Sequence, residues 1–464
     1  MILNQFYLGC LAHASYFIGD ESSGVAAVVD PQRDIGQYIE EAEARNMTIG
    51  HVFLTHFHAD FAAGHLELRD RTGAMIHLGA RAEADYAFEP MRDGGGMNLG
   101  RIRLAFLETP GHSPESVCIL VFDPEEAVSP YAALTGDTLF IGDVGRPDLR
   151  AALGWKAEDL ANLLYESLHG KLIPSTVDET LVYPAHGAGS LCGKNLSTDT
   201  VSTMGDQKKY NYALQPMDRE TFTRLITTDQ PEAPSYFTYD AAFNAQEHET
   251  LDHLLKRNLH PLSLEEVLRK AGDGAQVLDT RDAADYEGAH LKGSINIGLG
   301  GQYASWAGTL LRRDQPIVLI TESGAEEESA LRLGRIGFDH IAGYLEGGMH
   351  ALDERPDLLS RTDRITAAAL RDRLETKHPP LVLDIRSGQE RAGNAIRGSL
   401  HVPLNHLAER LGEIPAGTTV VVQCAGGYRS AMAASILKRN GISDVMDLVG
   451  GLAAWEAVQR ETAE

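Results

Sequence analysis

One stretch decides the fold of the N-terminal part of this chain: Thr55-His56-Phe57-His58-Ala59-Asp60-Phe61, directly after the mostly apolar residues 49–54. The apolar run has the length and composition of a buried strand. Two histidines and an aspartate at alternate positions just past its end can aim imidazole and carboxylate groups into one pocket, and these groups are common metal ligands. Position 61 holds a phenylalanine, which cannot bind a metal and therefore limits the kind of site.

Length and composition indicate a globular protein of several domains. The chain has 464 residues, for which about three domains is the usual expectation. Hydrophobic residues make up 43% of it and aromatic residues 7%, as in soluble globular proteins. The formal net charge of -25 argues against nucleic-acid and anionic-membrane partners, which need cationic patches. Four cysteines are too few for a disulfide framework, so we expect a reducing compartment.

The N-terminal residues lack the features of a secretion signal. No lysine or arginine precedes Arg33, so the basic region of a signal peptide is missing. The sequence also has no run of about 18 uncharged apolar residues, so we expect no membrane span. These features favour a cytoplasmic protein, with an organelle matrix after removal of a transit peptide as the alternative.

Short β-rich runs alternate with helical patterns in residues 1–200. Strands are expected at residues 25–29, 51–54, 102–107, 117–122 and 181–183. Residues 34–46 are expected to form a helix capped by Asp34, because apolar side chains recur there at helical spacing. Residues 93–96 (Asp-Gly-Gly-Gly) predict a turn and not a phosphate loop, because no helix start follows. Residues 205–258 are expected to form helical decoration and a connector.

The second half of the chain repeats itself. Val277-Leu278-Asp279-Thr280-Arg281 returns as Val382-Leu383-Asp384-Ile385-Arg386, and Leu291-Lys292-Gly293-Ser294 returns as Ile396-Arg397-Gly398-Ser399, both 105 positions later. A period of this length indicates two tandem domains and not a solenoid. Each copy runs helix, strand, loop, buried strand, helix, which predicts a small parallel sheet.

Four separated pieces of the first domain carry candidate metal ligands beside turn residues. They are His56-x-His58-x-Asp60, Thr109-Pro110-Gly111-His112, Thr135-Gly136-Asp137-Thr138 and Pro184-Ala185-His186-Gly187. A single histidine is more often a core or surface residue than a ligand. Four such loops in one domain, in the order that a metallo-hydrolase needs, favour a metal site.

Together these motifs closely resemble the metallo-β-lactamase fold family over residues 1–200. The resemblance implies an αββα sandwich with a metal at one edge. In that family the first motif continues to a further histidine after the aspartate, which helps to bind a second metal, and Phe61 stands at that position here. The loss implies a single metal ion. It argues against the dinuclear hydrolases of the family, including the glyoxalase II-like thioesterases.

The N-terminal pattern is similar to the persulfide dioxygenases, which oxidise a thiol persulfide with O2 at ferrous iron. The resemblance implies a 2-His-1-carboxylate site of His56, His112 and Asp137 on one Fe(II) per chain, a donor set suited to O2 chemistry. The glyoxalase-like and lactonase-like relatives keep zinc instead, and the resemblance implies zinc as the alternative metal in the purified protein. Three further side chains are implied to complete the pocket and to orient ligands or bound water: His58, Asp60 and His186.

Two other residues are candidate substrate contacts. Arg146 lies in Gly145-Arg146-Pro147-Asp148, where the similar enzymes place an arginine near the carboxylates of a glutathione substrate; a structural salt bridge is the alternative. Cys192 lies six positions past His186 in a glycine-flanked segment. It is either a sulfur carrier at the pocket mouth or a buried, inert thiol.

The last domain contains a cysteine loop, Cys424-Ala425-Gly426-Gly427-Tyr428-Arg429, between an expected strand at residues 418–423 and an expected helix at residues 430–440. A helix N-terminus lowers the pKa of a thiol and binds anions, and Arg429 can close the loop over the anion. The loop closely resembles the rhodanese active site, which implies that Cys424 and Arg429 are catalytic. Cys-dependent phosphatases have a related loop that is one residue longer.

The two rhodanese-like copies differ at this loop. Asp384 and Arg386 match the Asp-x-Arg of the fold and are expected to be structural charges first. In the middle copy the strand at residues 316–320 is followed by residues 321–328, which contain neither cysteine nor arginine and end in three glutamates. These acids would repel sulfite or persulfide. We therefore expect an inactive domain that serves for spacing or packing.

The domain order resembles the bacterial persulfide dioxygenase–sulfurtransferases. It implies a dioxygenase domain with a helical extension in residues 1–255, an inactive rhodanese-like domain in residues 256–358 and an active rhodanese in residues 359–464. The implied reaction oxidises a glutathione or coenzyme A persulfide to sulfite. Cys424 would then carry sulfane sulfur from a second persulfide to that sulfite, giving thiosulfate.

The expected partners are the small molecules thiol persulfide, O2 and sulfite, together with further copies of the chain in a dimer or tetramer. Three alternatives follow from the same motifs. One is a zinc thioesterase or lactonase fused to rhodanese, and another is a thiosulfate:cyanide sulfurtransferase with a vestigial metal domain. The third is a non-catalytic sulfur carrier or sensor, persulfidated at Cys424.

Overall fold

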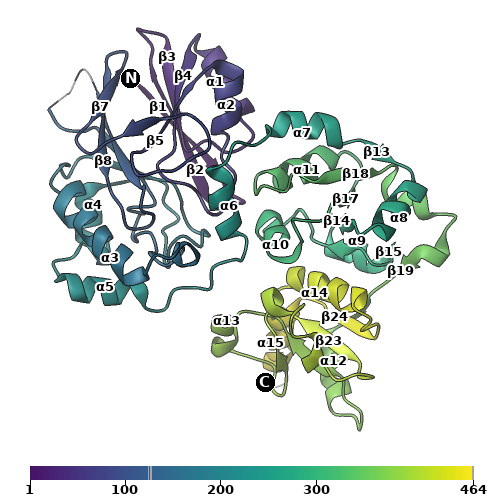
Figure 1. Ribbon diagram of the computed structural model, residues 1–464. Coiled ribbons are helices and arrows are strands. Elements are labelled where there is room, and N and C mark those ends of the chain that lie inside the picture. Colours follow the sequence, from purple (N-terminus) through teal and green to yellow (C-terminus); the bar gives the residue numbers. More distant parts are fainter. Residues whose placement is uncertain (124, 126–127, 462–464) are drawn as a thin grey trace. The chain divides into compact units, whose positions relative to one another are not determined.

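The chain folds into two compact units. The structure is a computed structural model that describes residues 1–123, 125 and 128–461 (Figure 1). Unit 1 comprises Met1–His253 together with Gly334–Gly337, and unit 2 comprises Leu254–Leu333 together with Phe338–Glu464.

Within the described residues, unit 1 contains two six-stranded sheets. The first sheet has the order β1-β2-β3-β4-β5-β6 and the second the order β12-β11-β10-β9-β8-β7. The first consists of β1 (Ile2–Leu8), β2 (His13–Asp20), β3 (Val25–Val29), β4 (Thr48–Phe53), β5 (Met75–Gly79) and β6 (Glu89–Met91). The second consists of β7 (Gly96–Leu99), β8 (Ile102–Glu108), β9 (Val117–Phe122), β10 (Ala132–Gly136), β11 (Leu181–Pro184) and β12 (Ser202–Thr203).

Strand β9 shows how the layers of unit 1 arise from its sequence. All six of its residues are buried. Val117, Ile119 and Val121 belong to the core between the two sheets, whereas the alternate residues, such as Cys118 and Leu120, belong to the core beneath the helices. Successive side chains of a strand point to opposite faces, so a strand covered on both sides must be apolar throughout.

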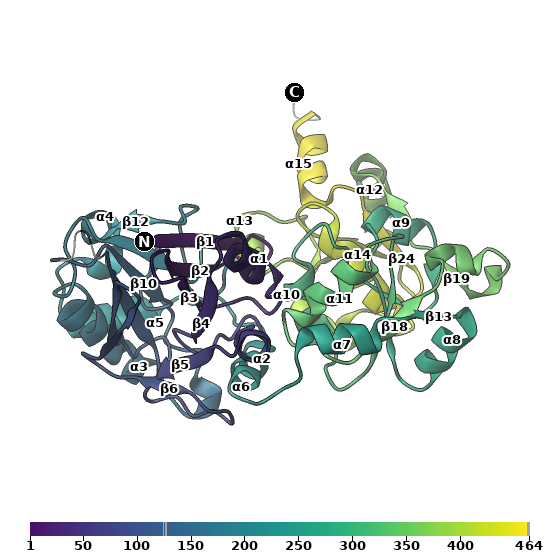
Figure 2. The same cartoon turned by 90° about the horizontal axis from the view of Figure 1, so that it is seen from above.

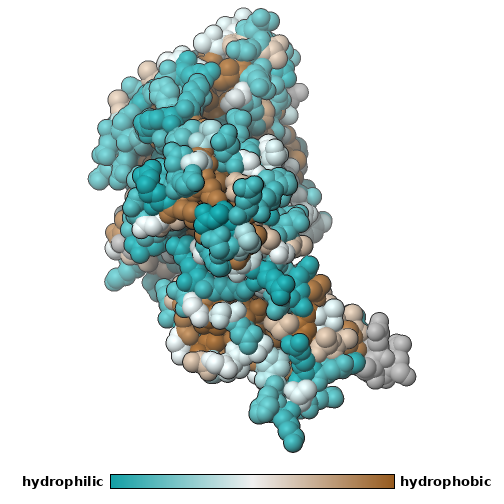
Figure 3. All heavy atoms as spheres, turned by 90° about the vertical axis from the view of Figure 1, so that its right-hand side faces the viewer, coloured by the Kyte–Doolittle hydropathy of each residue, from teal (hydrophilic) through white to brown (hydrophobic). Residues whose placement is uncertain are grey.

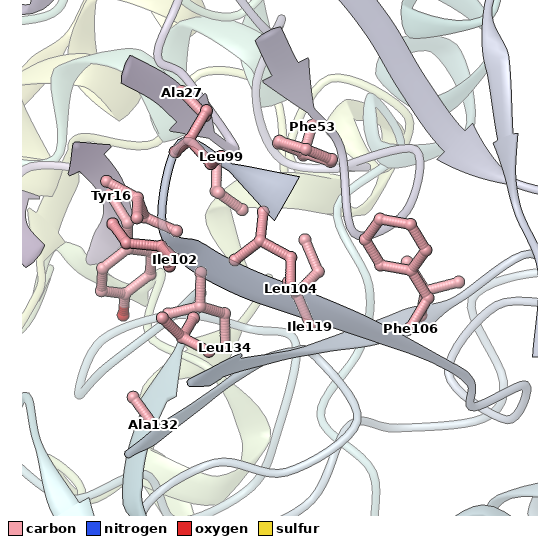
Figure 4. Close-up of a cluster of buried hydrophobic side chains, with 14 of the residues drawn as sticks. Tyr16, Ala27, Phe53, Leu99, Ile102, Leu104, Phe106, Ile119, Ala132 and Leu134 are labelled. Atoms are coloured by element: carbon pink, nitrogen blue, oxygen red, sulfur yellow. The ribbon is translucent and has the colours of Figure 1, made fainter. Parts of the chain in front are cut away.

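The core between the sheets draws on both of them, as Figure 4 shows. The residues labelled there are Tyr16, Ala27 and Phe53 from the first sheet, and Leu99, Ile102, Leu104, Phe106, Ile119, Ala132 and Leu134 from the second. Their burial holds the two sheets face to face, and this packing brings the loops at one edge of both sheets together.

Helices cover the outer faces of both sheets. In Figure 2, α1 (Gly36–Ala44) and α2 (His65–Thr72) lie on one side of the sheets of unit 1, and α3 (Ala157–Tyr165) and α4 (Met204–Tyr210) lie on the other. The π-helical η2 (Glu166–Leu172) and α5 (Arg219–Thr227) pack with α3 on the second sheet. The predicted αββα sandwich is confirmed.

The predicted cap of the first helix is wrong. Helix α1 is preceded by Ile35 as its N-cap, and no side chain caps it. Asp34 stands one position too early, because Ile35 already has helical backbone angles. The helical character of residues 205–258 is confirmed, since this segment forms α4, η3 (Tyr212–Leu214), α5, α6 (Phe237–Asn244) and α7 (Leu251–Asn258).

The part of unit 2 that the structure describes contains two five-stranded sheets of the same order. They are β13-β18-β17-β14-β16 and β20-β24-β23-β21-β22, and neighbouring strands within each are parallel. The identical order confirms the internal repeat. A separate two-stranded sheet joins β15 (His290–Leu291) and β19 (Leu359–Ser360).

The middle domain and the last domain supply the elements of unit 2 in turn. The middle domain contains β13 (Pro261–Leu262), α8 (Leu264–Gly272), β14 (Gln276–Asp279), α9 (Ala283–Gly288), β16 (Ile295–Asn296), α10 (Tyr303–Leu310), β17 (Ile317–Ile320), α11 (Glu326–Gly334) and β18 (Ile341–Leu345). The last domain contains β20 (Asp363–Ile365), α12 (Ala367–Leu374), β21 (Leu381–Asp384), α13 (Gly388–Gly393), β22 (Leu400–His401), β23 (Val420–Gln423), α14 (Tyr428–Arg439), β24 (Val445–Leu448) and α15 (Gly451–Glu461).

Hydrophilic residues predominate on the molecular face drawn in Figure 3, and hydrophobic residues there lie in smaller patches between them. Among the described residues, no helix is both long enough and apolar enough to cross a membrane.

Candidate metal centre and sulfur-transfer loop

Three donor side chains of unit 1 converge at the edge of the sandwich. His56 lies past the end of β4, His112 lies between β8 and β9, and Asp137 directly follows β10. All three are buried, and one ligand atom from each lies within 4.8 Å of the others. The Nε2 atoms of His56 and His112 lie 3.6 and 3.4 Å from Asp137 Oδ2. The structure therefore brings together the three residues that the resemblance implied as metal ligands.

Hydrogen bonds turn both imidazoles toward this point. His112 Nδ1 lies 3.0 Å from the carbonyl oxygen of Arg146, which can only accept, so Nδ1 donates and Nε2 keeps its lone pair. The Thr55 hydroxyl donates to Asp30 Oδ2 over 2.9 Å and lies 3.0 Å from His56 Nδ1. Because its proton is committed to Asp30, Thr55 accepts from His56 Nδ1 and leaves Nε2 free as well.

The charges of this group suit a divalent metal. Burial lowers the pKa of His56 and of His112, so both imidazoles are neutral. Burial by itself raises the pKa of Asp137, but the charge and hydrogen bond of His186 outweigh it and hold this pKa well below its ordinary value. His56 Nε2 and Asp137 Oδ2 are buried without a hydrogen-bond partner among the described residues. Such atoms are costly unless a ligand satisfies them, and these residues fit a metal ion.

A second group, His58, Asp60 and His186, lies beside the first, again with ligand atoms within 4.8 Å of one another. His186 bridges two carboxylates, with Nδ1 2.8 Å from Asp137 Oδ1 and Nε2 2.9 Å from Asp60 Oδ2. Burial lowers the pKa of His186, but the two carboxylates raise it well above its ordinary value. His58 Nε2 lies 2.9 Å from Asp30 Oδ1. This group thus orients Asp137 so that Oδ2 faces the histidines.

Phe61 is buried beside this second group and contacts a residue that the sequence did not single out. The centre of its ring lies 4.4 Å from that of His58 and 3.9 Å from that of His13. His13 is buried, and neither of its ring nitrogens makes a well-formed hydrogen bond to a described residue. It forms an isolated β-bridge with His186. No spacing in the sequence indicates that His13 lies at this site, because only the folding of the sheet brings it there.

The backbone of the first motif is held by a side chain of the helical extension. Asn244, at the end of α6, donates from Nδ2 to the carbonyl oxygens of His58 and Phe61 over 2.9 and 2.8 Å. Its Oδ1 accepts from the N–H of Ala63 over 2.8 Å. Asn244 is fully buried, so the extension serves the site as well as decorating the sandwich.

A buried ion pair holds the same motif from another side. Arg150 Nη2 lies 3.1 Å from Glu115 Oε1 and donates to the carbonyl oxygen of Phe57 over 2.8 Å. Glu115 Oε1 accepts from the N–H of Phe57 over 3.0 Å. The sequence analysis missed Asn244, Glu115 and Arg150, because none lies in a recognisable motif.

Two glycines allow the close approach of the ligand loops. A Cβ at Gly145 would lie 2.0 Å from the carbonyl oxygen of Asp137 and 2.9 Å from His112 Cβ. Gly136 has a φ of +52°, and a Cβ there would lie 2.6 Å from Thr55 Oγ1. Side chains at either position would push the ligand loops apart.

The two candidate substrate contacts are differently placed. Arg146 is buried and pairs with both carboxylate oxygens of Asp148, Nε to Oδ1 at 2.7 Å and Nη2 to Oδ2 at 2.6 Å, which favours the structural alternative. Cys192 is buried, and its ligand atom lies within 4.8 Å of those of Asp137 and His186. Burial, together with Asp60 and Asp137, raises the pKa of this thiol well above its ordinary value.

In unit 2, the Cys424 loop connects β23 to α14. Cys424 is buried, and its Sγ accepts from the N–H of Gly427 over 3.1 Å. Gly427, with a φ of +107°, is the N-cap of the helix. The guanidinium of Arg429 donates to both carboxylate oxygens of Glu390, over 2.6 and 2.8 Å, so Arg429 is already paired with a carboxylate beside the loop. Arg429 lowers the pKa of Glu390 to about 2, and the sequence analysis missed this partner.

The Asp-x-Arg pairs of the two copies are buried ion pairs. Arg386 Nη2 lies 2.7 Å from Asp384 Oδ2, and Arg281 Nη2 lies 2.7 Å from Asp279 Oδ2 in the middle domain. Both arginines also donate to backbone carbonyl oxygens. The same arrangement in a domain without a catalytic cysteine favours the structural role.

Comparisons with known proteins agree with this architecture. The family model of the metallo-beta-lactamase superfamily matches residues 8–186, and that of the rhodanese-like domain matches residues 263–355 and 366–458. The persulfide dioxygenase ETHE1, mitochondrial, of Bos taurus is 30% identical over 234 residues, which cover 49% of this chain and 80% of that protein. A hydroxyacylglutathione hydrolase of Methylococcus capsulatus is 33% identical over 133 residues, which cover 28% of this chain and 49% of that protein.

A solved structure extends the likeness beyond the first domain. The metallo-beta-lactamase from Staphylococcus aureus subsp. aureus COL is 31% identical, with a TM-score of 0.66, and the match covers 74% of this chain and 98% of that one. Fold and site define the class as a metallo-β-lactamase-fold enzyme with two rhodanese-like domains. Within it, the chain belongs to the persulfide dioxygenase family. The general reactions of this class are the oxidation and the transfer of sulfur.

Proposed function

We propose that this enzyme oxidises a low-molecular-weight thiol persulfide, of the glutathione or coenzyme A type, with O2 at a single Fe(II). We further propose that Cys424 transfers sulfane sulfur to the sulfite formed, giving thiosulfate. The proposed oxidation at a single metal rests on the convergence of His56, His112 and Asp137, with Phe61 in place of a ligand for a second metal. This donor set and the bovine persulfide dioxygenase support iron over zinc.

The oxidation balances without another reductant. One persulfide R-S-SH, one O2 and one water give the thiol R-SH, one sulfite and two protons. The outer sulfur is oxidised and O2 is reduced by the same four electrons. Bound Fe(II) supplies the redox chemistry and the binding of O2 at this site.

The protein's own residues hold and orient the centre. His56, His112 and Asp137 would bind the metal, with both Nε2 atoms free because each Nδ1 donates elsewhere. His186 holds Asp137 by its other oxygen over 2.8 Å. Phe61 places a buried apolar ring beside this group, and a phenylalanine cannot serve as a ligand for a second metal.

Sulfur transfer also balances as two exchanges at Cys424. The Cys424 thiolate attacks the outer sulfur of a second persulfide R-S-SH. An S–S bond forms on Cys424, the S–S bond of the persulfide breaks, and the leaving thiolate takes up the persulfide's proton as R-SH. The resulting Cys424-S-S⁻ gives its outer sulfur to sulfite, so thiosulfate forms and the Cys424 thiolate returns. The N–H of Gly427 already donates to Sγ, and it supports the negative charge in both exchanges.

The test uses the full chain loaded with Fe(II) without air and supplied with glutathione persulfide. The wild type should consume O2 and form mainly thiosulfate. Cys424→Ser should accumulate sulfite with O2 uptake intact, because it lacks only the sulfur acceptor. Unchanged thiosulfate from Cys424→Ser would contradict the two-site reaction.

A matched variant at the metal centre separates the alternatives. His112→Ala should lose O2 uptake and keep sulfur transfer from thiosulfate to cyanide. A wild type that consumes no O2, together with unchanged sulfur transfer in His112→Ala, would show that the metal domain is vestigial. Two zinc ions per chain without O2 uptake would favour a thioesterase or lactonase, and a wild type without any turnover would favour a sulfur carrier or sensor.

A further inference from the structure

The middle domain reaches the catalytic loop of the last domain. Both belong to unit 2. The hydroxyl of Tyr428, inside the Cys424 loop, donates over 2.7 Å to the carbonyl oxygen of Gly298, which lies just past β16. Burial raises the pKa of Tyr428, so the hydroxyl keeps the proton that it donates. Helix α14 packs on α9 and β16, and Ser435 Oγ accepts from the N–H of Asn296 over 3.2 Å, so the contact is part of a packed face.

The ring of Tyr428 lies close against Gly301. A Cβ at Gly301 would lie 2.5 Å from Tyr428 Cζ and 2.6 Å from its Cε1. A Cβ at the neighbouring Gly300 would meet only Asp282 Oδ1, at 3.6 Å, an ordinary contact. The loop of residues 298–301, hereafter the glycine loop, therefore accommodates the tyrosine ring at one specific position.

The glycine loop is itself braced by an arginine of the middle domain. Arg332, in α11, donates from Nη1 to the carbonyl oxygen of Leu299 over 2.8 Å and from Nη2 to that of Gly301 over 3.2 Å. Its guanidinium lies 5.2 Å from the centre of the Tyr303 ring. Only 9% of the Arg332 side chain is exposed, so the brace is a fixed part of the domain.

We propose that the middle domain is a positioning element of the sulfur-transfer site: its glycine loop, braced by Arg332, fixes Tyr428 and through it the Cys424 loop. Gly427, the residue before Tyr428, donates its N–H to Cys424 Sγ over 3.1 Å. A displaced Tyr428 therefore moves the donor that faces the reacting sulfur. This inference rests on the proposed sulfur transfer at Cys424, and it assigns a role to a domain that has no cysteine of its own.

The experiment compares two alanine variants of the glycine loop in the full chain. Gly301→Ala places a methyl group against the Tyr428 ring, whereas Gly300→Ala is the matched control. The thiosulfate:cyanide sulfurtransferase assay should show a loss in kcat of about tenfold for Gly301→Ala, and a change within about twofold for Gly300→Ala, because sub-ångström displacement of reacting groups is costly. O2 uptake with glutathione persulfide should stay at the wild-type level in both.

A double-mutant cycle distinguishes positioning from general damage. If Gly301 acts through Tyr428, then Gly301→Ala should have no further effect in a Tyr428→Ala background. An equal loss in both backgrounds, or wild-type kcat in Gly301→Ala, would overturn the inference. Should Gly301→Ala fail to fold, Arg332→Met replaces it, with an expected loss in kcat that Arg332→Lys partly restores, and wild-type kcat in Arg332→Met would overturn the inference. A wild type without sulfur transfer would instead contradict the proposed function.

Discussion

The side-chain amide of Asn244 donates a 2.9 Å hydrogen bond to the carbonyl oxygen of His58, although 186 positions separate the two residues. The same amide group binds the carbonyl oxygen of Phe61 and the N–H of Ala63. The helical extension after the sandwich thus holds the backbone of the metal motif in place. All of these groups are buried, so solvent does not reach them to replace the hydrogen bonds of the asparagine.

Asn244→Ala should weaken both the fold of unit 1 and its metal site. It leaves buried backbone groups without a partner, at a cost of about 2–3 kcal/mol. Denaturant unfolding and metal content of the purified protein measure the two effects. Asn244→Asp retains the acceptor for Ala63 but loses the donor to both carbonyl oxygens, so it should be at least as destabilising. Wild-type stability in both variants would show that the extension is decoration only.

Phe61→His should restore a ligand for a second metal. Its new imidazole would join His58, Asp60 and His186, whose ligand atoms already lie within 4.8 Å of one another. We expect about one metal ion per chain in the wild type and up to two in Phe61→His after reconstitution with zinc, as determined by elemental analysis. Phe61→Leu, which keeps an apolar side chain, should remain at one. Two ions in the wild type would show that position 61 does not decide the stoichiometry.

The stability of unit 2 should fall as the pH rises from about 5 to about 8. Burial, and then Asp447, raise the pKa of Glu287 to about 8, and burial raises that of Asp447. Unfolded carboxyl groups titrate near pH 4, so in this range the folded chain binds more protons than the unfolded chain and loses stability as protons leave. Arg364, at 3.0 Å from Glu287, only partly offsets the burial.

Glu287→Gln tests this pH dependence because it removes the titration and keeps the shape. The wild type should melt about 2–4 °C lower at pH 8.5 than at pH 5.5, and the difference should shrink in Glu287→Gln. Differential scanning calorimetry measures both transitions. An equal difference in the two proteins would assign the pH dependence to other groups.

Glu390→Gln should strengthen the binding of anionic substrates at the Cys424 loop. Arg429 lowers the pKa of Glu390 to about 2, so the carboxylate stays charged at ordinary pH and competes with substrate anions for the guanidinium. The KM for thiosulfate should fall by about twofold to fivefold, a range typical of partly exposed ion pairs. Glu390→Asp keeps the charge and should change KM less. A raised KM in Glu390→Gln would mean that Glu390 orients Arg429.

The pairing of Glu390 with Arg429 should not shape the pH profile of sulfur transfer. The pKa of Glu390 is lower in the folded chain than in the unfolded chain. The stability that this carboxylate contributes is therefore present above about pH 4.5 and is lost only as the pH falls toward 2. The profiles of the wild type and Glu390→Gln between pH 6 and 9 should therefore run parallel.

Local patterns predicted most of the fold of this chain. The strand at Val117–Phe122 is apolar at every position because it is covered on both faces, and the repeat of residues 277–281 at 382–386 reflects two sheets with the same strand order. Such features depend on neighbouring residues, so they are legible in one sequence. The cap at Asp34 was wrong because a shift of one position changes which residue precedes the helix.

The sequence by itself determined the chemical donors: two histidines and an aspartate in loops after strands, and a cysteine in the loop before a helix. It also placed a phenylalanine, which cannot bind a metal, at position 61. The tertiary structure alone decided what surrounds them. The ring of His13 lies against that of Phe61, Asn244 holds the metal motif, Glu390 pairs with Arg429, and Gly301 faces Tyr428. The physical reason is that these contacts join residues far apart in the chain, and their side chains meet only after the sheets and helices have packed.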